Sequence, residues 1–109
     1  MPVITGYHAH IYFDATSVAK ARTLGEAAAR ELPVDMGRVH EKCVGPHPMW
    51  SCQLTFAPGD LQQVLEWLML NRDGLIIFTH PDTGDHLLDH RDRAIWMGAY
   101  LPLELSIFG

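Results

Sequence analysis

The sequence predicts an α+β fold in which strands and helices alternate along most of the chain. Residues 6–13 and 49–56 alternate apolar and polar side chains with the two-residue period of a strand. Residues 58–70 instead repeat apolar side chains every three to four positions, which is the period of a helix. Glycine and proline residues punctuate the chain between these segments, as they do in turns.

The first half of the chain is predicted to form a strand, a helix and two further strands. On strand 6–13 one face carries Tyr7, Ala9, Ile11 and Phe13, and the other carries His8, His10 and Tyr12. Asp14 or Thr16 can cap a helix that runs to about Leu32. Gly25 inside that helix weakens it slightly or marks a close approach to the sheet. Strands 36–44 and 49–56 follow, and the prolines of Gly45-Pro46-His47-Pro48 make their connection stiff.

The second half adds a helix over residues 58–70, with Asp60 and Gln63 in capping-box spacing. A strand over residues 75–79, a loop-rich segment, a short element at 94–97 and a final alternating strand at 101–108 complete the chain. The order β-α-β-β-α-β plus a C-terminal extension is that of the ferredoxin-like split βαβ sandwich. Two helices then cover one sheet face. The extension or a second subunit must cover the face that bears His8 and His10, so we expect a homodimer.

Composition narrows the function classes. A length of 109 residues suits a single domain, 1–109, and 48% hydrophobic residues indicate a folded chain. A net charge of −5 without a run of basic residues argues against nucleic-acid binding. The apolar stretches are too short for a membrane span, and the N-terminus lacks the zones of a signal peptide. With two cysteines only, we expect a reduced, cytoplasmic protein.

Seven histidines in 109 residues point to a metal or proton-transfer site. His8 and His10 share a strand face. In the predicted topology the strand that ends at His80 pairs antiparallel with the first strand, which places His80 opposite His8. Three converging imidazoles suit Fe(II), Zn or Mn. We therefore predict that His10 and His80 bind a metal, with His8 or His47 as the third ligand.

The segment from Arg38 to Pro48 supplies further candidate site residues. Arg38, His40 and Lys42 would share one strand face and Glu41 the other, and Arg38 offers a planar fork for a substrate carboxylate. The alternative is a solvated edge strand that its charges protect from pairing. His47, held between two prolines, suits a ligand or acid–base role. Simple topology places it at the sheet end opposite His8 and His80, unless it bends over the face or reaches a partner subunit.

Residues 86–92 allow two interpretations. Asp89 or Asp92 could orient a neighbouring imidazole. The commoner meaning of such a stretch is a solvated, charged loop.

Taken together, six segments resemble the DOPA 4,5-dioxygenase family over nearly the whole chain. They are His8-Ala9-His10-Ile11-Tyr12-Phe13-Asp14, Gly37-Arg38-Val39-His40-Glu41-Lys42, Gly45-Pro46-His47-Pro48-Met49-Trp50, Leu70-Asn71-Arg72, His80-Pro81-Asp82-Thr83-Gly84-Asp85 and Asp89-His90. The joint occurrence of these segments is far more specific than any one of them.

The resemblance implies extradiol cleavage of a catechol, DOPA or a related one, by O2 at a non-haem Fe(II). In that chemistry the metal ligands would be His8, His10 and His80, and an imidazole, His40 or His47, would take the catechol proton. Arg38, Glu41 and Tyr12 would contact the substrate. Glu41 could instead complete a two-histidine, one-carboxylate triad.

Two other function classes remain open at this stage. One is a non-catalytic, dimeric module that binds a metal or a small molecule. The other is a cofactor-free monooxygenase, which the same fold allows because a fold does not decide function.

Overall fold

The computed structural model describes residues 1–109 and contains one five-stranded antiparallel sheet. The elements are β1 (Gly6–Phe13), α1 (Val18–Glu31), β2 (Asp35–Cys43), β3 (Trp50–Phe56), α2 (Leu61–Asn71), β4 (Ile76–Asp82), α3 (His86–Arg91) and β5 (Ile95–Met97). Short 3-10 helices occupy Pro58–Asp60 and Leu105–Phe108. The α+β class is confirmed, and the first six strands and α-helices follow the predicted β-α-β-β-α-β order.

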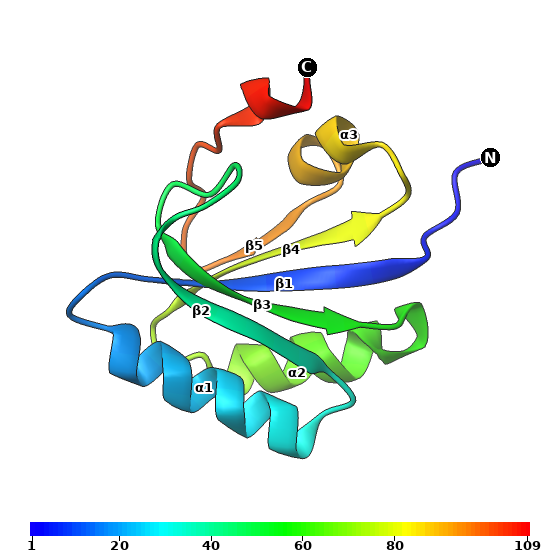
Figure 1. The fold of residues 1–109 in the computed structure, drawn as a ribbon. Coiled ribbons are helices and arrows are strands. Elements are labelled where there is room, and N and C mark those ends of the chain that lie inside the picture. Colours follow the sequence, from blue (N-terminus) through cyan, green and yellow to red (C-terminus); the bar gives the residue numbers. More distant parts are fainter.

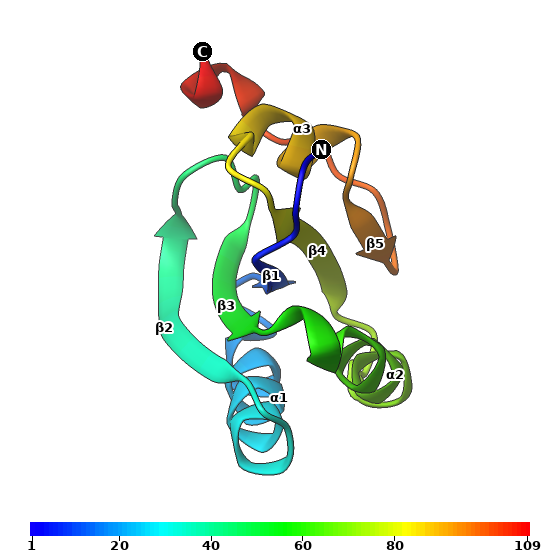
Figure 2. The same ribbon diagram turned by 90° about the vertical axis from the view of Figure 1, so that its right-hand side faces the viewer.

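The sheet has the strand order β2-β3-β1-β4-β5, so β1 lies at its centre. Helices α1 and α2 cover one face, whereas α3 and the C-terminal residues lie on the other side (Figures 1 and 2). The covering of the second face by the chain's own extension is one of the two arrangements predicted above.

The alternation in β1 produces a two-sided strand. Ala9, Ile11 and Phe13 face the helices and are at most 1% exposed, in one core cluster with Leu54 of β3 and Leu68 of α2. Burial of a large apolar side chain contributes about 1.5–3 kcal/mol, so this face anchors β1 in the sheet. The opposite residues, His8, His10 and Tyr12, are thereby fixed on the face away from α1 and α2.

Gly25 marks a close approach between α1 and the sheet, which is the second of the two interpretations given above. A Cβ at this position would lie 2.8 Å from Cε of Met36 in β2. Glycine therefore lets the Met36 side chain pack directly against the helix backbone.

The predicted last strand over residues 101–108 is wrong. Residues 101–104 form no regular element, and Leu105–Phe108 is a 3-10 helix. The edge of β4 is already paired with β5, through Ile77 with Met97 and Thr79 with Ile95. Pro102 in addition has no N–H to donate to a ladder. The segment instead crosses to the β2–β3 loop, where the Glu104 N–H donates to the Pro46 carbonyl at 2.9 Å.

The loop predicted after β4 also differs, because residues 86–91 form helix α3. Asp85 caps this helix by accepting a hydrogen bond from the Leu88 N–H at 3.1 Å. The capping box predicted for α2 does not form, since Asp60 makes no side-chain cap bond. At α1 the N-cap is Ser17, and Asp14 instead accepts from the Thr16 N–H in the preceding turn.

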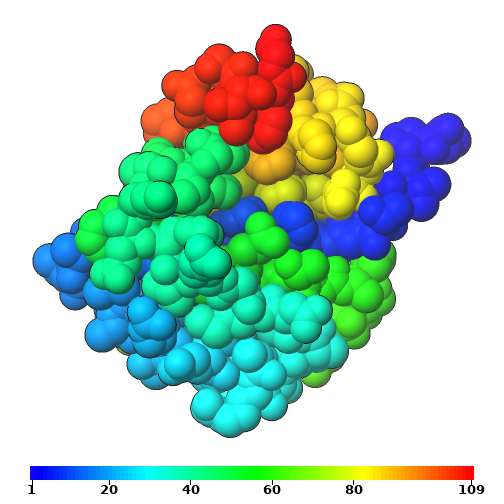
Figure 3. Space-filling view, viewed as in Figure 1, coloured from blue at the N-terminus to red at the C-terminus, as the bar shows by residue number.

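The surface view shows the C-terminal segment lying against α3 and the β2–β3 loop (Figure 3). None of the helices is long and apolar enough to cross a membrane.

Candidate functional site

Three histidines meet on the sheet face opposite α1 and α2. His8 of β1 pairs directly with His80 of β4, and His10 lies two residues further along β1 on the same face. The ring nitrogens that the three residues offer lie within 4.8 Å of one another. His10 and His80 are each only 4% exposed, and His8 is half-buried. The predicted convergence of these imidazoles at one sheet end is confirmed.

The donor set fits a divalent metal. Nδ1 of His80 donates to the Pro81 carbonyl at 2.9 Å, which leaves Nε2 with a free lone pair. Nε2 of His10 lies 3.0 Å from Nε2 of His80. Two nitrogens that bind one ion at about 2.0–2.1 Å and at right angles to each other would be about 3 Å apart. Imidazoles are ligands that Zn, Fe and Mn share, so this set does not distinguish these metals.

Burial keeps these imidazoles uncharged. Desolvation lowers the pKa of His80 to about 4 and holds the pKa of His10 well below its usual value. The pKa of His8 is also lowered by burial, although the carboxylate of Asp82 partly offsets the effect. Neutral imidazoles are the form that binds metals, so the site is ready for a cation near neutral pH.

His47 bends over the same sheet face. The β2–β3 loop turns at Gly45, whose φ of +54° is a left-handed conformation suited to glycine. The His47 ring then lies 4.2 Å from the ring of His10, measured between centroids. Its Nδ1 is 2.7 Å from the Tyr12 hydroxyl. The first of the placements left open for His47 is the one observed.

The Tyr12–His47 hydrogen bond fixes the orientation of the His47 ring. Tyr12 is 1% exposed and its hydroxyl makes no other hydrogen bond, so the hydroxyl and Nδ1 of His47 satisfy each other. Burial raises the pKa of Tyr12, which keeps its hydroxyl protonated. Nε2 of His47 is the ring nitrogen that this hydrogen bond leaves unoccupied. Burial and the neighbouring His90 and His40 lower the pKa of His47 to about 4.

A fifth imidazole, His90, is brought to the site by α3. Its ring lies 3.9 Å from that of His80, and its Nδ1 donates to the His86 carbonyl at 2.7 Å. Burial lowers the pKa of His90. His90 is not among the residues predicted for the site. The spacing of His86 and His90, one helical turn apart after the cap residue Asp85, was the signal available.

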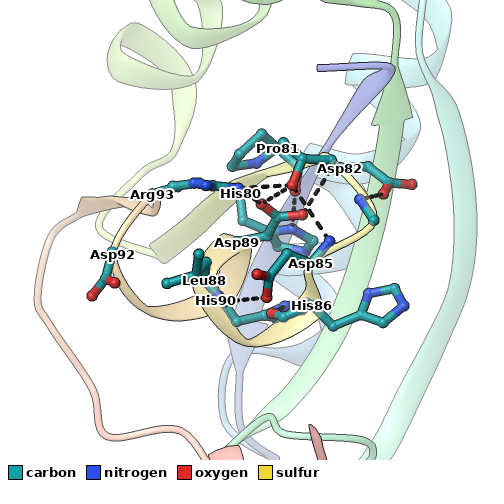
Figure 4. Close-up of polar contacts among 12 residues, drawn as sticks. His80, Pro81, Asp82, Asp85, His86, Leu88, Asp89, His90, Asp92 and Arg93 are labelled. Atoms are coloured by element: carbon teal, nitrogen blue, oxygen red, sulfur yellow. Dashed lines mark hydrogen bonds and ion pairs between the residues drawn. The ribbon is translucent and has the colours of Figure 1, made fainter. Parts of the chain in front are cut away.

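Asp89 anchors α3 rather than orienting an imidazole. It is 1% exposed and accepts from the Thr83 N–H at 2.7 Å, the Thr83 hydroxyl at 2.8 Å and Arg93 at 3.1 Å (Figure 4). Although burial raises the pKa of Asp89, these hydrogen bonds outweigh it and hold the pKa below its usual value. Asp92 pairs with Arg91 on the surface instead. Neither residue contacts a histidine through its carboxylate, so the suggested orienting role is wrong, as is the solvated-loop interpretation for Asp89.

The imidazoles line a cavity of about 240 Å³. This volume is below the roughly 300–1,000 Å³ of sites for drug-sized ligands, and suits a single small ring. Its walls are His8, His10, Pro46, His47, Gln53, His80, Pro81, Asp82, His86, Asp89, His90 and Phe108. Gln53, opposite His10 on β3, is a second lining residue that sequence reasoning missed. On the β4 side of the site, Phe78 packs against the rings of His10 and His80 and lies 4.5 Å from Trp96 between ring centroids, which makes this side apolar.

The other predicted residues lie on β2, at the sheet edge. His40 is half-buried opposite Ser51, close enough to His47 for its charge to lower the pKa there. Arg38 and Glu41 are exposed, form no side-chain hydrogen bond or ion pair, and do not line the histidine cavity. The structure thus brings together His8, His10, His80, His47 and Tyr12, but not Arg38 or Glu41.

The lowered histidine pKa values predict that the metal-free protein loses stability in mild acid. An unfolded histidine titrates near 6.5, whereas folded His80 titrates at about 4, so between these values the unfolded chain binds more protons. The free energy of unfolding should therefore be constant above about pH 7 and fall below it, by about 3 kcal/mol at pH 4 from His80 alone. Urea unfolding at a series of pH values measures this loss. A free energy that stays flat from pH 7 to pH 4 would contradict it.

Comparisons with known proteins agree on one family. The profile of the Dopa 4,5-dioxygenase family matches residues 7–107. A DOPA 4,5-dioxygenase of Amanita muscaria is 33% identical over 112 residues, which cover 94% of this chain and 49% of that protein. An uncharacterized 21.2 kDa protein of Botryotinia fuckeliana is 37% identical over 113 residues, covering 93% of this chain and 62% of the relative. The chain thus spans 49% and 62% of the length of these two relatives.

A crystal structure shows the same fold. It is that of a candidate dioxygenase from Nostoc punctiforme, which superimposes with a TM-score of 0.92 at 44% sequence identity. The match covers 94% of this chain and 90% of the other.

Proposed function

The chain belongs to the DOPA 4,5-dioxygenase family, and on this premise we propose that it is an extradiol dioxygenase that opens the ring of a catechol with O2. The observation that carries the proposal is the set of three neutral histidines, His8, His10 and His80, gathered at a cavity of single-ring size. DOPA itself or a related catechol is the proposed substrate.

The three histidines would hold Fe(II), with Zn or Mn as the other metals that this donor set accepts. Fe(II) would supply open coordination positions for the two catechol oxygens and for dioxygen. The protein would position three imidazole nitrogen lone pairs, two on β1 and one on β4, toward one metal ion. The Pro81 carbonyl fixes the ring of His80, and the register of β1 and β4 fixes His8 against it.

His47 is the proposed proton-handling residue. Because Tyr12 occupies its Nδ1, Nε2 is the ring nitrogen left to exchange a proton with an oxygen atom bound in the cavity. Tyr12 would hold the His47 ring in place through this hydrogen bond. His40 lies on β2, near His47. We propose that the charge of His40 adjusts the pKa of His47.

The apolar wall would keep water from the reacting ring. Phe78 is fully buried and packs against His10 and His80, with Trp96 of β5 packed against Phe78 in turn. Phe108 of the C-terminal 3-10 helix packs against His90. Exclusion of water strengthens every electrostatic interaction in such a site.

Anaerobic loading tests the proposal. We expect the chain to take up one Fe(II), and to consume O2 and form a yellow ring-opened product when a catechol and air are added. The same protein without metal, and the loaded protein given a phenol that lacks the second hydroxyl, should give neither signal. Metal uptake with no oxygen consumption from any catechol would contradict the proposal and indicate a binding module.

We further propose a homodimer in a reducing, cytoplasmic setting. Large apolar side chains remain exposed near both termini, including Ile4, Tyr100 and Ile107, and both cysteines are free thiols. Light scattering at micromolar concentration should report twice the chain mass of 12.3 kDa. A monomer at these concentrations would contradict the dimer.

A further inference from the structure

An aromatic chain of three residues leads from the histidine cluster to the protein surface. Its first member, Phe78 of β4, lies 5.6 Å from the ring of His10 and 5.4 Å from that of His80, measured between centroids. Trp96 of β5 lies 4.5 Å from Phe78, and Tyr100 lies 5.3 Å from Trp96. These are separations of aromatic rings in contact. Tyr100 is 75% exposed, so the aromatic chain ends in solvent.

The backbone fixes the order of this aromatic chain. Phe78 and Trp96 are paired directly in the antiparallel register of β4 and β5, so their side chains lie next to each other on the face that bears the histidines. After β5 the backbone turns at Gly98, whose φ of +91° is a left-handed conformation. Tyr100 follows this turn and packs its ring against Trp96.

The residue types in the aromatic chain suit electron transfer. Tryptophan and tyrosine are the aromatic side chains that lose one electron most readily. Of the three tryptophans, Trp96 is the one whose ring contacts tyrosines, namely Tyr12 and Tyr100. Tyr12 is buried, whereas Tyr100 can release its phenolic proton to solvent as it loses an electron. Trp50 packs on Phe13 of the core instead.

We propose that Trp96 and Tyr100 form a protective redox pair, which carries oxidising equivalents away from the histidine site to solvent. The proposal rests on the proposed function for its oxidant, an oxygen-centred radical that arises when O2 is only partly reduced at the site. A protein that handles O2 has to limit such competing reactions. The buried imidazoles of His10 and His80 are otherwise the nearest targets of the radical.

The transfer consists of two one-electron steps. The radical takes one electron from the Trp96 indole, across the contact with Phe78, and one proton from solvent, so that its O• becomes O–H. Tyr100 then gives one electron to the Trp96 radical cation and its phenolic proton to water. In sum, one electron and one proton pass from the Tyr100 hydroxyl to the radical, and Trp96 is restored. A thiol or catechol in solution returns a hydrogen atom to Tyr100.

The step between Trp96 and Tyr100 can be tested in the metal-free protein. Pulse radiolysis in azide solution oxidises tryptophan side chains by one electron, and absorption spectroscopy follows the tryptophan and tyrosine radicals separately. We expect a tryptophan radical to decay into a tyrosine radical at a rate that does not depend on protein concentration. Tyr100→Phe and Trp96→Phe should each abolish this phase. Tyr7→Phe alters a ring that stacks on Phe56 of the core, and should leave the phase unchanged.

Peptide mass mapping tests the protective role in the Fe(II)-loaded protein. After exposure to hydrogen peroxide without a catechol, oxidation should concentrate at Tyr100 and spare His10 and His80. Trp96→Phe keeps a ring beside Phe78 but cannot pass the electron, so oxidation should move to the two histidines. Trp50→Phe is the matched control and should give the pattern of the unaltered protein. The Zn-loaded protein, whose metal has no redox chemistry, should show neither pattern.

The metal-free measurement separates this inference from the proposed function. If the radical passes to Tyr100 but the loaded protein cleaves no catechol, the proposed function fails and the redox pair stands. A tryptophan radical that decays only in encounters between molecules overturns the inference. A tyrosine radical that is lost in Tyr12→Phe, and not in Tyr100→Phe, overturns it as well, because the charge then goes to a buried residue. Histidine oxidation that is equal with and without Trp96 overturns the protective role.

Discussion

Replacing His10 by alanine should abolish metal binding. His10 is 4% exposed and its Nε2 stands 3.0 Å from the Nε2 of His80, so its loss removes one of the two closest donor nitrogens of the cluster. Loss of an outer-shell partner of a metal ligand costs about 10–100-fold in affinity. Loss of a direct ligand should exceed that range, and His80→Ala should have the same effect. Elemental analysis after dialysis against a fixed metal concentration measures the result.

His86→Ala is the matched control, since it removes an exposed imidazole that does not belong to the three-histidine cluster. This variant should retain its metal. His10→Gln fills more of the side-chain volume, so a metal-free but folded His10→Gln variant would show that the loss does not arise from misfolding. Full metal content in both His10→Ala and His80→Ala would remove the basis of the proposed site.

Asp89→Ala should destabilise the protein by about 2–4 kcal/mol. The substitution leaves Arg93 and the Thr83 N–H without the buried carboxylate that they share, and breaking such a pair is costly because its remaining partner stays desolvated. For a chain of this size the thermal midpoint should fall by roughly 10–20 °C. Because Asp89 fastens α3 over the sheet, the environment of Phe78 and Trp96 should also change, which near-UV circular dichroism detects.

Asp92→Ala supplies the comparison for this effect. It removes a carboxylate of the same helix end whose ion pair with Arg91 is exposed, so the thermal midpoint should hardly move. Equal shifts in the two variants would mean that Asp89 does not anchor α3.

The elements with a clear period were predictable. The alternation of His8, His10 and Tyr12 against Ala9 and Ile11 predicts both the central strand and its two faces. The approach of His80 to His8 then follows from the topology, because β4 runs antiparallel beside β1 and a one-residue slip would turn its apolar face out of the core. The metal-ligand candidates could thus be found without coordinates.

The structure of the C-terminal third could not be predicted, because two of its segments compete for pairing with the edge of β4. Leu101 to Ile107 alternates as a strand should, but the free edge of β4 is taken by Ile95–Met97, and a strand without a partner does not form. Helix α3 has six residues, which is too short for a periodic signal, and its stability comes from the Asp89 contacts that only the tertiary structure creates. His90 entered the site with that helix and was missed for the same reason.

The position of His47 over the histidine-bearing sheet face could not be predicted from the sequence either. Its distance from His10 depends on how the β2–β3 loop curls at Gly45, and on the hydrogen bond to Tyr12. The two prolines predict that the loop is stiff, but they do not predict which way it folds over the sheet.

Arg38 was selected because its guanidinium suits a carboxylate ligand. The structure places it on the edge strand β2, where it is exposed to solvent.

The two innermost ligand candidates stand 70 residues apart in the chain, on strands that become neighbours only when the sheet is assembled. Such distant pairings form late, because the intervening chain must first be closed into a loop. Until β4 docks beside β1, the chain therefore presents only the His8 and His10 pair of one strand, and His80 completes the three-histidine set last. Under the proposed function, tight metal binding would require the completed sheet, and earlier folding states would lack the third ligand.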